Sequence, residues 1–435
     1  MKQVNIGICG LGTVGSGALG VLVENADVIE ARACTSVVVS HIGARRDNPN
    51  ADTSALKVSR DIFDVVRDPD VNIVVELIGG TTTAKDLVLE AISNGKHIVT
   101  ANKALIAECG NEIFEAAAAN GVAVAYEAAV AGGIPIIRAL REGLSANQIE
   151  SVAGIINGTG NFILTEMRDK GRDFSDVLKE AQELGYAEAD PTFDVEGIDA
   201  AHKLAILASI AFGIPLQFDK VFTEGISKLE PIDVSNAAEL DFSIKHLGIA
   251  RQTEAGIEMR VHPTLVPKSQ LIAHVDGVLN AVMVEGDAVG PTLYSGAGAG
   301  AGPTASSVVA DVVEIARQID VTAECRTPYL GFHHQKLNDY PVLSIEECET
   351  ALYLRFNAID KPGVLSQITE IFSEASISVE AMVQKDRPAQ HAEVPIVVLT
   401  SVAKQSDFDS LVSKLERLDV VVGSVTHIRV DRLES

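Results

Sequence analysis

The chain has 435 residues and a formal net charge of −25; hydrophobic residues make up 47% of it and aromatic residues only 4%. This length predicts two or three domains, and cores of small aliphatic side chains suit a parallel α/β architecture. The acidic balance argues against nucleic acid or an anionic membrane as the main partner, and no apolar run reaches membrane-spanning length. Five scattered cysteines without a C-x-x-C pair predict neither disulfides nor zinc and favour the cytoplasm.

The N-terminal segment has the pattern of a dinucleotide-binding domain. A β-branched run at residues 4–9 leads into GLGTVG, and a helical stretch follows at 16–24. Glycines at this spacing permit a tight turn and a close approach of the backbone to a pyrophosphate, although a purely structural strand–helix turn is the alternative. The expected cofactor-binding residues are Gly10, Leu11, Gly12, Thr13, Val14 and Gly15.

The second expected strand, residues 36–40, lacks the acidic residue that binds the ribose 2′-hydroxyl in NAD enzymes. The chain continues as HIGARR, with Arg45 and Arg46 where that carboxylate would lie. Guanidinium groups suit a 2′-phosphate, so NADP is favoured while NAD stays open. Two arginines that merely face solvent are the alternative.

Lys103 follows an expected strand at 97–100, in the run TANKALIA. Further strands at 71–78 and 122–126, with helices at 85–93 and 111–119, predict a doubly wound sheet, in which ligands bind at the carboxyl ends of the strands. Lys103 is therefore expected to contact the nicotinamide or a substrate carboxylate. The alternative, a simple first-turn helix lysine, is disfavoured by the helix dipole.

Two polar turns follow in the middle of the chain. The Gly-rich loop EAAVAGGIPI exposes carbonyl oxygens beside Glu127, which suits either a hard cation or a plain hinge. After a strand at 149–156, the residues Asn157, Thr159 and Asn161 either orient a substrate or cap a helix.

The segment 183–203 gathers six carboxylates before Lys203. Asp199 and Lys203 are four residues apart at the start of a helical run that is apolar almost all round, so both project from one face. A surface ion pair is the alternative on spacing alone. Desolvation lowers the pKa of a buried ammonium group, so a lysine at the start of a buried helix suits general acid or base chemistry.

The last third of the chain predicts a second sheet and a separate module. Strands are expected within 243–266 and 280–294. The run SGAGAGAGP is either a flexible linker or a loop feeding a helix that has Pro303 at its first position and an apolar part at 308–315. A βαββαβ pattern then predicts a ferredoxin-like module. Its strands are expected at 352–357, 377–384, 394–400 and 420–430, and its helices at 363–373 and 406–418.

Six segments together resemble bacterial homoserine dehydrogenases, in the order of that family and over essentially the whole chain. They are GLGTVG, TANKALIA, EAAVAGGIPI, GIINGTGNFILTEM, GYAEADPTFDVEGIDAAHK and GAGAGPTASSVVAD. The C-terminal module is similar to an ACT domain, with DKPGVL as its strongest segment. The resemblance implies the monofunctional form of the enzyme and three regions: a Rossmann cofactor domain at 1–130 completed by 303–340, an α/β substrate and dimerisation domain with a mixed sheet at 131–302, and the ACT module at 350–430.

The reaction that this resemblance implies is the reversible reduction of L-aspartate 4-semialdehyde to L-homoserine with NAD(P)H, on the route to threonine, methionine and isoleucine. Lys203 would donate the proton, and Glu188, Asp199 and Lys103 would bind the substrate. The resemblance adds Lys103, Gly185 and Gly302 to the cofactor site. It assigns Glu127, Val130, Gly132 and Ile134 to a monovalent cation, expected to be sodium. Threonine is the expected effector of the ACT module, and a homodimer or homotetramer the expected assembly.

Three other functions compete with this one. An ACT-containing prephenate dehydrogenase would want a histidine and arginine pair, whereas this substrate half supplies lysine and carboxylates. An aspartate-semialdehyde dehydrogenase would need a nucleophilic cysteine, and no cysteine has a suggestive setting. A non-enzymatic sensor of NADP and amino acids would not need Glu188, Asp199 and Lys203.

Overall fold

The computed structural model describes residues 3–384 and 393–433. The chain divides into two compact units. The first unit comprises residues 1–158, 199–221 and 278–340, and the second comprises residues 159–198, 222–277 and 341–435. Among the described residues, no helix has the length and apolar character needed to cross a membrane.

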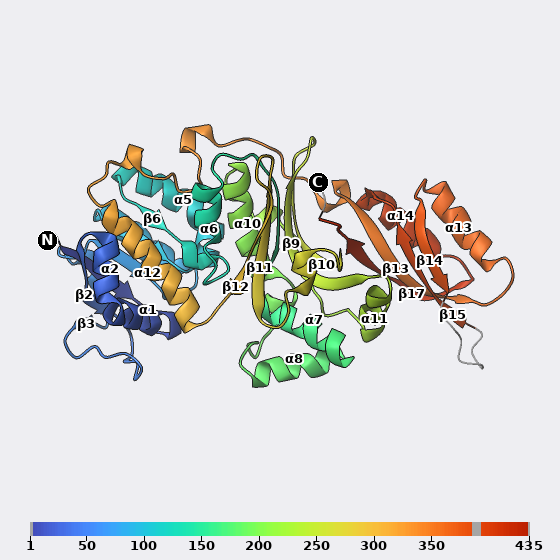
Figure 1. Ribbon diagram of the computed structural model, residues 1–435, viewed down its shortest axis with the longest axis horizontal. Coiled ribbons are helices and arrows are strands. Elements are labelled where there is room, and N and C mark those ends of the chain that lie inside the picture. Colours follow the sequence, from blue (N-terminus) through green and yellow to red (C-terminus); the bar gives the residue numbers. More distant parts are fainter. Residues whose placement is uncertain (1–2, 385–392, 434–435) are drawn as a thin grey trace. The chain divides into compact units, whose positions relative to one another are not determined.

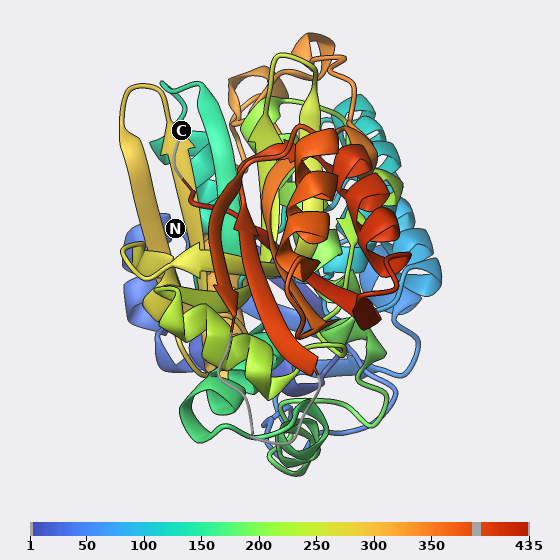
Figure 2. The same ribbon diagram turned by 90° about the vertical axis from the view of Figure 1, so that its right-hand side faces the viewer.

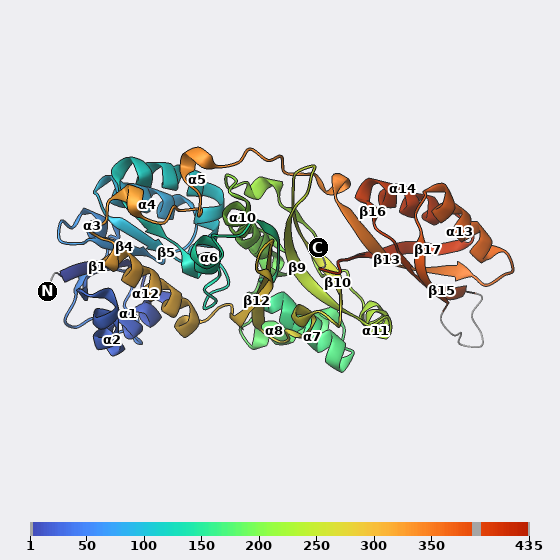
Figure 3. The ribbon, with the colours of Figure 1, turned by 45° about the horizontal axis from the view of Figure 1, so that its top comes forward.

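The first unit contains a six-stranded parallel sheet with the order β3-β2-β1-β4-β5-β6, which confirms the doubly wound prediction. Its strands are β1 (Gln3–Cys9), β2 (Ser36–Gly43), β3 (Lys57–Ser59), β4 (Ile73–Glu76), β5 (His97–Thr100) and β6 (Val124–Ala125). Its helices are α1 (Thr13–Glu24), α2 (Ala26–Ala33), α3 (Phe63–Arg67), α4 (Thr82–Ser93), α5 (Lys103–Asn120) and α12 (Ala301–Arg317). Helices α1, α2 and α12 cover one face of this sheet and α3, α4 and α5 the other (Figure 3).

Helix α12 joins the core of this sheet although it is far away in sequence. Its Val308 and Val312 are fully buried in one cluster with Ile6 and Ile73, and the helix packs along α1 (Figure 1). The Gly-rich run before it therefore feeds a helix that returns to the parallel sheet, and the flexible-linker alternative is wrong. Helix α12 begins at Ala301, so Pro303 is its third residue and not its first. The position is still tolerated, because backbone N–H groups in the first turn have no helical partner.

The first unit also holds an antiparallel sheet in the order β12-β11-β7. Its strands are β7 (Ile149–Ile155), β11 (Leu279–Gly286) and β12 (Gly290–Ala297), so the predicted run at 280–294 is a hairpin of two strands. Helix α10 (Ile198–Phe212) is buried over nearly its whole circumference, as its sequence predicts. The short helix α6 (Ile136–Arg138) follows the loop at 127–135.

The second unit contains the sheet order β9-β10-β17-β13-β15-β14, with β8 (Phe222–Thr223) pairing β10. The strands β9 (Phe242–Gln252) and β10 (Ile257–Pro267) form an antiparallel hairpin from the predicted run at 243–266. The helices outside the C-terminal module are α7 (Gly158–Lys170), α8 (Phe174–Glu183), α9 (Thr192–Val195) and α11 (Pro231–Glu239).

The C-terminal module has the predicted βαββαβ order. Its elements are β13 (Glu349–Ile359), α13 (Val364–Glu374), β14 (Val379–Gln384), β15 (Glu393–Thr400), β16 (Ala403–Lys404), α14 (Gln405–Glu416) and β17 (Val421–Val430). Helices α13 and α14 pack side by side on one face of its sheet, as Figure 2 shows, over a core that includes Phe356, Ile368 and Phe408. The ferredoxin-like prediction is therefore confirmed.

Candidate active site

Lys203 and Asp199 form a buried pair at the start of α10. Lys203 is 8% exposed and Asp199 4%. The Lys203 Nζ donates to Asp199 Oδ2 at 2.6 Å and to the Ile156 carbonyl at 2.7 Å. Their spacing of four residues indeed places both side chains on one face, but the surface ion pair that spacing alone allowed is wrong.

Lys103 and Asn157 complete this cluster. The Lys103 Nζ lies 2.7 Å from Asp199 Oδ1, and Asn157 Nδ2 donates to Asp199 Oδ2 at 2.9 Å. Burial opposes ionisation of Asp199, but the ammonium groups of Lys203 and Lys103 more than offset it and hold the pKa of Asp199 well below its usual value. Lys103 from α5 and Lys203 from α10, two of the predicted site residues, thus both contact the ionised carboxylate of a third, Asp199.

Helix α5 begins earlier than predicted, and this places Lys103. Its predicted start was residue 111, whereas the helix begins at Lys103. Asn102 is its N-cap residue, since its side chain accepts a hydrogen bond from Leu105 N at 3.1 Å and donates one to Gly80 O at 2.7 Å. Lys103 is therefore held at the carboxyl end of β5, with its side chain 37% exposed.

Glu76, at the end of β4, was missed by the sequence analysis. Its carboxylate is fully buried, accepts from Ile78 N at 2.8 Å and accepts from Thr100 Oγ1 at 2.6 Å. Burial raises the pKa of Glu76. Thr100 Oγ1 in turn accepts from Asn102 N at 3.0 Å, so Glu76 supports the turn that carries the α5 N-cap. A lone acidic residue ending an apolar strand was the only sequence signal.

The remaining predicted substrate residues lie in the second unit. Glu188 is exposed, after α8, and Gly185 nearby has a φ of +75°. Thr159 Oγ1 donates to Tyr186 O at 2.6 Å, and Asn161 Nδ2 donates to Val275 O at 3.1 Å. The side chains of Thr159 and Asn161 therefore brace neighbouring backbone, while Asn157 contacts the Asp199 carboxylate.

The glycine fingerprint has the geometry that a dinucleotide requires. A Cβ on Gly10, whose φ is +102°, would lie 2.5 Å from Leu77 O, and one on Gly15 would lie 2.1 Å from Gly10 O. Apart from Gly12 and its chain neighbours, no atom of the described residues lies within 4 Å of a Cβ on Gly12, the N-cap residue of α1. Gly10 and Gly15 thus permit the turn and the close helix packing, and Gly12 leaves open space at a helix N-terminus, which fits a pyrophosphate.

The loop after β2 carries the two predicted arginines. Arg45 and Arg46 are both exposed. The next acidic residue, Asp47, is paired with Arg60 at 2.8 Å. Asn48 Nδ2 donates to Leu11 O at 2.9 Å and so ties this loop to the glycine fingerprint, a contact that the sequence analysis missed.

Gly302, the other predicted cofactor residue, lies exposed in the first turn of α12. That turn approaches α1 closely, because a Cβ on Gly17 would lie 2.8 Å from Ala301 O.

The loop at 127–135 is buried and tightly turned. Ala131 and Gly132 both have positive φ values, +54° and +52°, which is costly for alanine and marks a fixed backbone. The Glu127 carboxylate accepts from Ile137 N and Arg138 N, both at 2.9 Å. Burial, followed by the nearby Asp311, raises the pKa of Glu127 to about 7. Among the described residues no cluster of histidine, cysteine and acidic side chains could hold a metal, so a cation here would have to use backbone carbonyls.

The parallel sheet, the glycine cradle and the lysine–carboxylate cluster define a nicotinamide-dinucleotide-dependent oxidoreductase, joined to a ferredoxin-like module. Family models agree with each part of this description. "Homoserine dehydrogenase, NAD binding domain" matches residues 10–127, "Homoserine dehydrogenase" matches residues 135–313, and "ACT domain" matches residues 352–420. The chain belongs to the homoserine dehydrogenase family.

Individual relatives match over the whole length. Homoserine dehydrogenase from Pseudomonas aeruginosa is 60% identical, with all of both chains covered. The crystal structure of a homoserine dehydrogenase from Thiobacillus denitrificans has a TM-score of 0.94 at 57% identity, covering 100% of this chain and 99% of that one. A hyperthermophilic archaeal homoserine dehydrogenase in complex with NADPH has a TM-score of 0.60 at 25% identity, covering 72% of this chain and 97% of that one. The protein is thus an oxidoreductase of amino-acid biosynthesis with a nicotinamide cofactor and an ACT domain.

Proposed function

We propose that Lys203 exchanges the proton when L-aspartate 4-semialdehyde and L-homoserine are interconverted. The supporting observation is the Lys203 Nζ, buried between Asp199 and the Ile156 carbonyl. In reduction, the ammonium donates its proton to the alkoxide oxygen that forms as the aldehyde carbon gains hydride; in oxidation, the neutral amine takes the hydroxyl proton. The nicotinamide, when bound, supplies or accepts that hydride.

Asp199, Lys103 and Glu188 bind the substrate in this proposal. The substrate carries an ammonium group and a carboxylate, which match the two acids and the lysine. Lys103 is the most exposed member of the first-unit cluster, with 37% of its side chain accessible. Its ammonium group can therefore leave Asp199 and bind the carboxylate of the substrate.

Steady-state oxidation of L-homoserine by Lys203→Ala tests the proton role. We expect kcat to fall by about 10²- to 10⁴-fold while NADPH binds as in wild type. Lys85→Ala is the matched control, since Lys85 pairs with Glu112 at 2.7 Å on the surface and should change turnover little. Full turnover by Lys203→Ala would exclude the proposed role.

We also propose that NADP is preferred over NAD. Arg45 and Arg46 supply guanidinium groups beside the glycine fingerprint, and Asp47 is already paired with Arg60. The residues present fit a dinucleotide, since Gly12 leaves open the space that the pyrophosphate would occupy.

A monovalent cation, sodium by preference, is proposed at the carbonyls of Glu127, Val130, Gly132 and Ile134. Ala131 and Gly132 have consecutive positive φ values, which mark a backbone in one defined conformation. Ser307 Oγ also holds this loop, since it donates to Gly132 O at 2.7 Å. Turnover in sodium, potassium and tetramethylammonium chloride, at constant ionic strength, tests the site; equal rates in all three salts would exclude it.

We further propose that threonine inhibits the enzyme through the ACT domain. A cavity of about 460 Å³ lies against the β13–α13 turn, residues 360–365, and includes Gln384 and Ile396. Such a turn leaves backbone N–H groups at the start of α13 for an amino-acid carboxylate.

The assembly and the location complete the proposal. A homodimer or homotetramer is supported by the apolar residues Val278 and Val289, which are 41% and 47% exposed beside the β11–β12 hairpin. Light scattering during gel filtration measures the assembly directly, and a monomer would contradict it. A cytoplasmic location is supported by the five cysteines, all free thiols. Cell fractionation tests it.

A further inference from the structure

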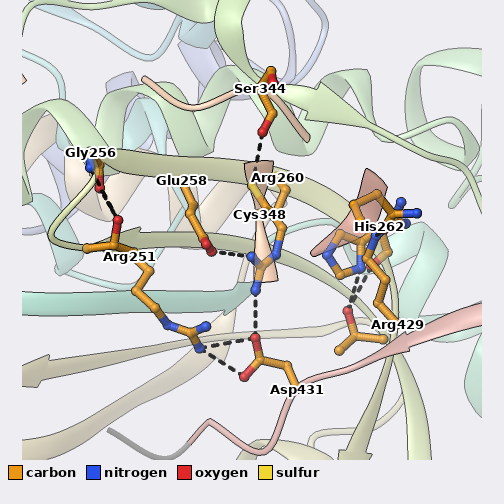
Figure 4. Close-up of polar contacts among 12 residues, drawn as sticks. Arg251, Gly256, Glu258, Arg260, His262, Ser344, Cys348, Arg429 and Asp431 are labelled. Carbon is orange, nitrogen blue, oxygen red and sulfur yellow. Dashed lines mark hydrogen bonds and ion pairs between the residues drawn. The ribbon is translucent and has the colours of Figure 1, made fainter. Parts of the chain in front are cut away.

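The strand that ends the ACT domain is joined to β10 by buried charges. Strand β17 pairs with β10 in parallel through Thr264 with Arg429 and Leu265 with Val430. Arg260, fully buried on β10, donates to Asp431 Oδ2 at 2.8 Å, and Arg251 donates to Asp431 Oδ1 at 3.0 Å (Figure 4). The junction between β10 and β17 therefore contains one fully buried ion pair, Arg260–Asp431, and a second, in which the Arg251 side chain is 27% exposed.

Arg429 links this junction to two further segments. It is 4% exposed; its Nε donates to Gln405 Oε1 at 3.0 Å and its Nη1 donates to Glu224 Oε2 at 2.5 Å. The guanidinium also lies 5.0 Å from the ring centre of Phe222. Gln405 is the first residue of α14, so one buried side chain connects a helix of the ACT domain with the segment 222–227 outside it.

The segment 222–227 in turn supports the residues before α10. Glu224 N donates to Val261 O at 2.8 Å, and Ile226 N donates to Val195 O at 2.9 Å. Ser227 Oγ donates to Glu196 Oε1 at 2.7 Å. At Gly225 the approach is so close that a Cβ would lie 2.7 Å from Val195 O.

The segment 222–227 makes a second contact, with the side chain of His246. Its Nε2 lies 3.0 Å from Glu224 O, and burial lowers the pKa of this histidine, so the ring is neutral and donates there. The same end of the ring, atoms Cε1 and Nε2, lies 3.3 Å from the Cβ position of Gly197, whose φ is +84°. Gly197 directly precedes Ile198, the first residue of α10, and Asp199 and Lys203 are the second and sixth residues of that helix.

We propose that the Arg429–Glu224 ion pair positions the start of α10, so that the ACT domain acts on the Asp199–Lys203 pair through it. Glu224 and Arg429 are positioning residues, without contact to reacting atoms, and the proposal rests on the proton role of Lys203. Removing Glu224 leaves the Arg429 guanidinium, whose side chain is 4% exposed, without its carboxylate partner, and removing Arg429 takes away the side chain that holds Glu224; either change favours a shift of the segment 222–227. Such a shift reaches Val195, Glu196 and Gly197 through the contacts above.

The test compares Glu224→Gln and Arg429→Met with the double variant. Each single variant should lower kcat for L-homoserine oxidation about tenfold, and the double variant should fall no further than the worse single one, since the pair acts as a unit. The dissociation constant for NADPH should stay unchanged. Arg429→Lys, which keeps the charge, should recover most of kcat. Lys414→Gln is the matched control: it removes an ion pair to Glu374 of 3.2 Å that lies wholly between α14 and α13, and kcat should stay as in wild type.

Two results would overturn the coupling. The first is an unchanged kcat in both single variants. The second is a loss of kcat that Arg429→Lys does not recover and that Lys414→Gln also shows, because general destabilisation of the ACT domain would then explain the loss. Glu224→Gln preserves the shape of the side chain and serves if Arg429→Met does not fold. The Lys203→Ala experiment separates the two proposals: an active Lys203→Ala variant removes the proton role, whereas an inactive one beside a fully active Glu224→Gln removes only the coupling.

Discussion

Asp199 is the residue on which the first-unit site converges. It accepts from Lys203 and Asn157 through one oxygen and faces Lys103 with the other. An amide at this position keeps the size of the side chain but removes the negative charge that Asp199 places between the ammonium groups of Lys103 and Lys203. We expect Asp199→Asn to lower kcat/KM for L-homoserine by about 10²-fold, while NADPH binding stays intact. Parallel steady-state and cofactor-titration measurements would check this, and an unchanged kcat/KM would contradict it.

The arginine pair after β2 allows a second prediction at the scale of single residues. Exposed guanidinium groups that contact a 2′-phosphate stabilise NADP but contribute nothing to NAD. The double variant Arg45→Ala and Arg46→Ala should therefore raise KM for NADP by about 10- to 100-fold and leave KM for NAD within about twofold. Arg32→Ala, on the exposed face of α2, is the control. Equal losses with both cofactors would show that the arginines do not discriminate between them.

Asp68 supplies a pH-dependent prediction. Its hydrogen bond from Lys57 at 2.8 Å, helped by His41, lowers the pKa of Asp68 to about 2. Because the carboxyl of the unfolded chain has a pKa of about 3.9, the native state gains stability from this group above that pH and loses it as pH falls toward 2. Asp68→Asn should thus lower the melting temperature by a few degrees at pH 7 and progressively less below about pH 4.

Scanning calorimetry from pH 7 to pH 3 measures this trend. Asp47→Asn serves as its control, because the Asp47 side chain is 78% exposed and its pair with Arg60 should contribute little. A destabilisation by Asp68→Asn of constant size down to pH 3 would contradict the assignment.

At the scale of elements, the glycine fingerprint separates folding from binding. Gly15 faces Gly10 O with no room for a methyl group, whereas Gly12 faces open space. Gly15→Ala should therefore lower the melting temperature by several degrees. Gly12→Val should keep the melting temperature and raise the dissociation constant for NADPH at least about tenfold, since the side chain would fill the approach of the pyrophosphate. Tight NADPH binding by Gly12→Val would place the cofactor elsewhere.

The sequence predicted elements well wherever periodicity continued through the whole element. The ACT strands and helices lie within a few residues of their predicted bounds, and α10 is the buried helix expected to carry Asp199 and Lys203 near its start. Errors arose where a local signal decided a boundary: with Asn102 as its N-cap, α5 begins at Lys103, eight residues before the predicted start, and with Gly300 as its N-cap α12 begins ahead of Pro303. The runs at 243–266 and 280–294 each contain two strands of a hairpin, and the prediction of strands there did not give their turns.

The candidate site was predicted in part. Asp199 and Lys203 follow from helical spacing, but their contact with Lys103 joins residues almost a hundred positions apart, which periodicity cannot supply. Glu76 contacts the Ile78 backbone and the Thr100 side chain, and Asn48 contacts the Leu11 backbone; neither set of contacts has a sequence signature. The domain limits remain a prediction, since the compact units cut across the expected region 131–302.

For the whole molecule, the ACT cavity predicts how an effector acts. L-threonine should inhibit homoserine oxidation, and Gln384→Ala, at the cavity wall, should raise the inhibitory concentration about 5- to 30-fold without changing turnover in its absence. Thr369→Ala, on α13 outside the cavity lining, is the control. Identical inhibition curves for wild type and Gln384→Ala would place the effector elsewhere.

The junction of β10 and β17 also constrains how the protein is made. Asp431, one of the two carboxylates that pair with the buried Arg260, lies 171 positions further along the chain, so at ribosomal speed this partner is added roughly 10 to 30 s after the arginine. During that interval the nascent chain contains Arg260 without Asp431, and the edge of β10 that later pairs with β17 is uncovered. Because an uncovered strand edge favours aggregation, slower translation between these two codons should prolong an aggregation-prone state.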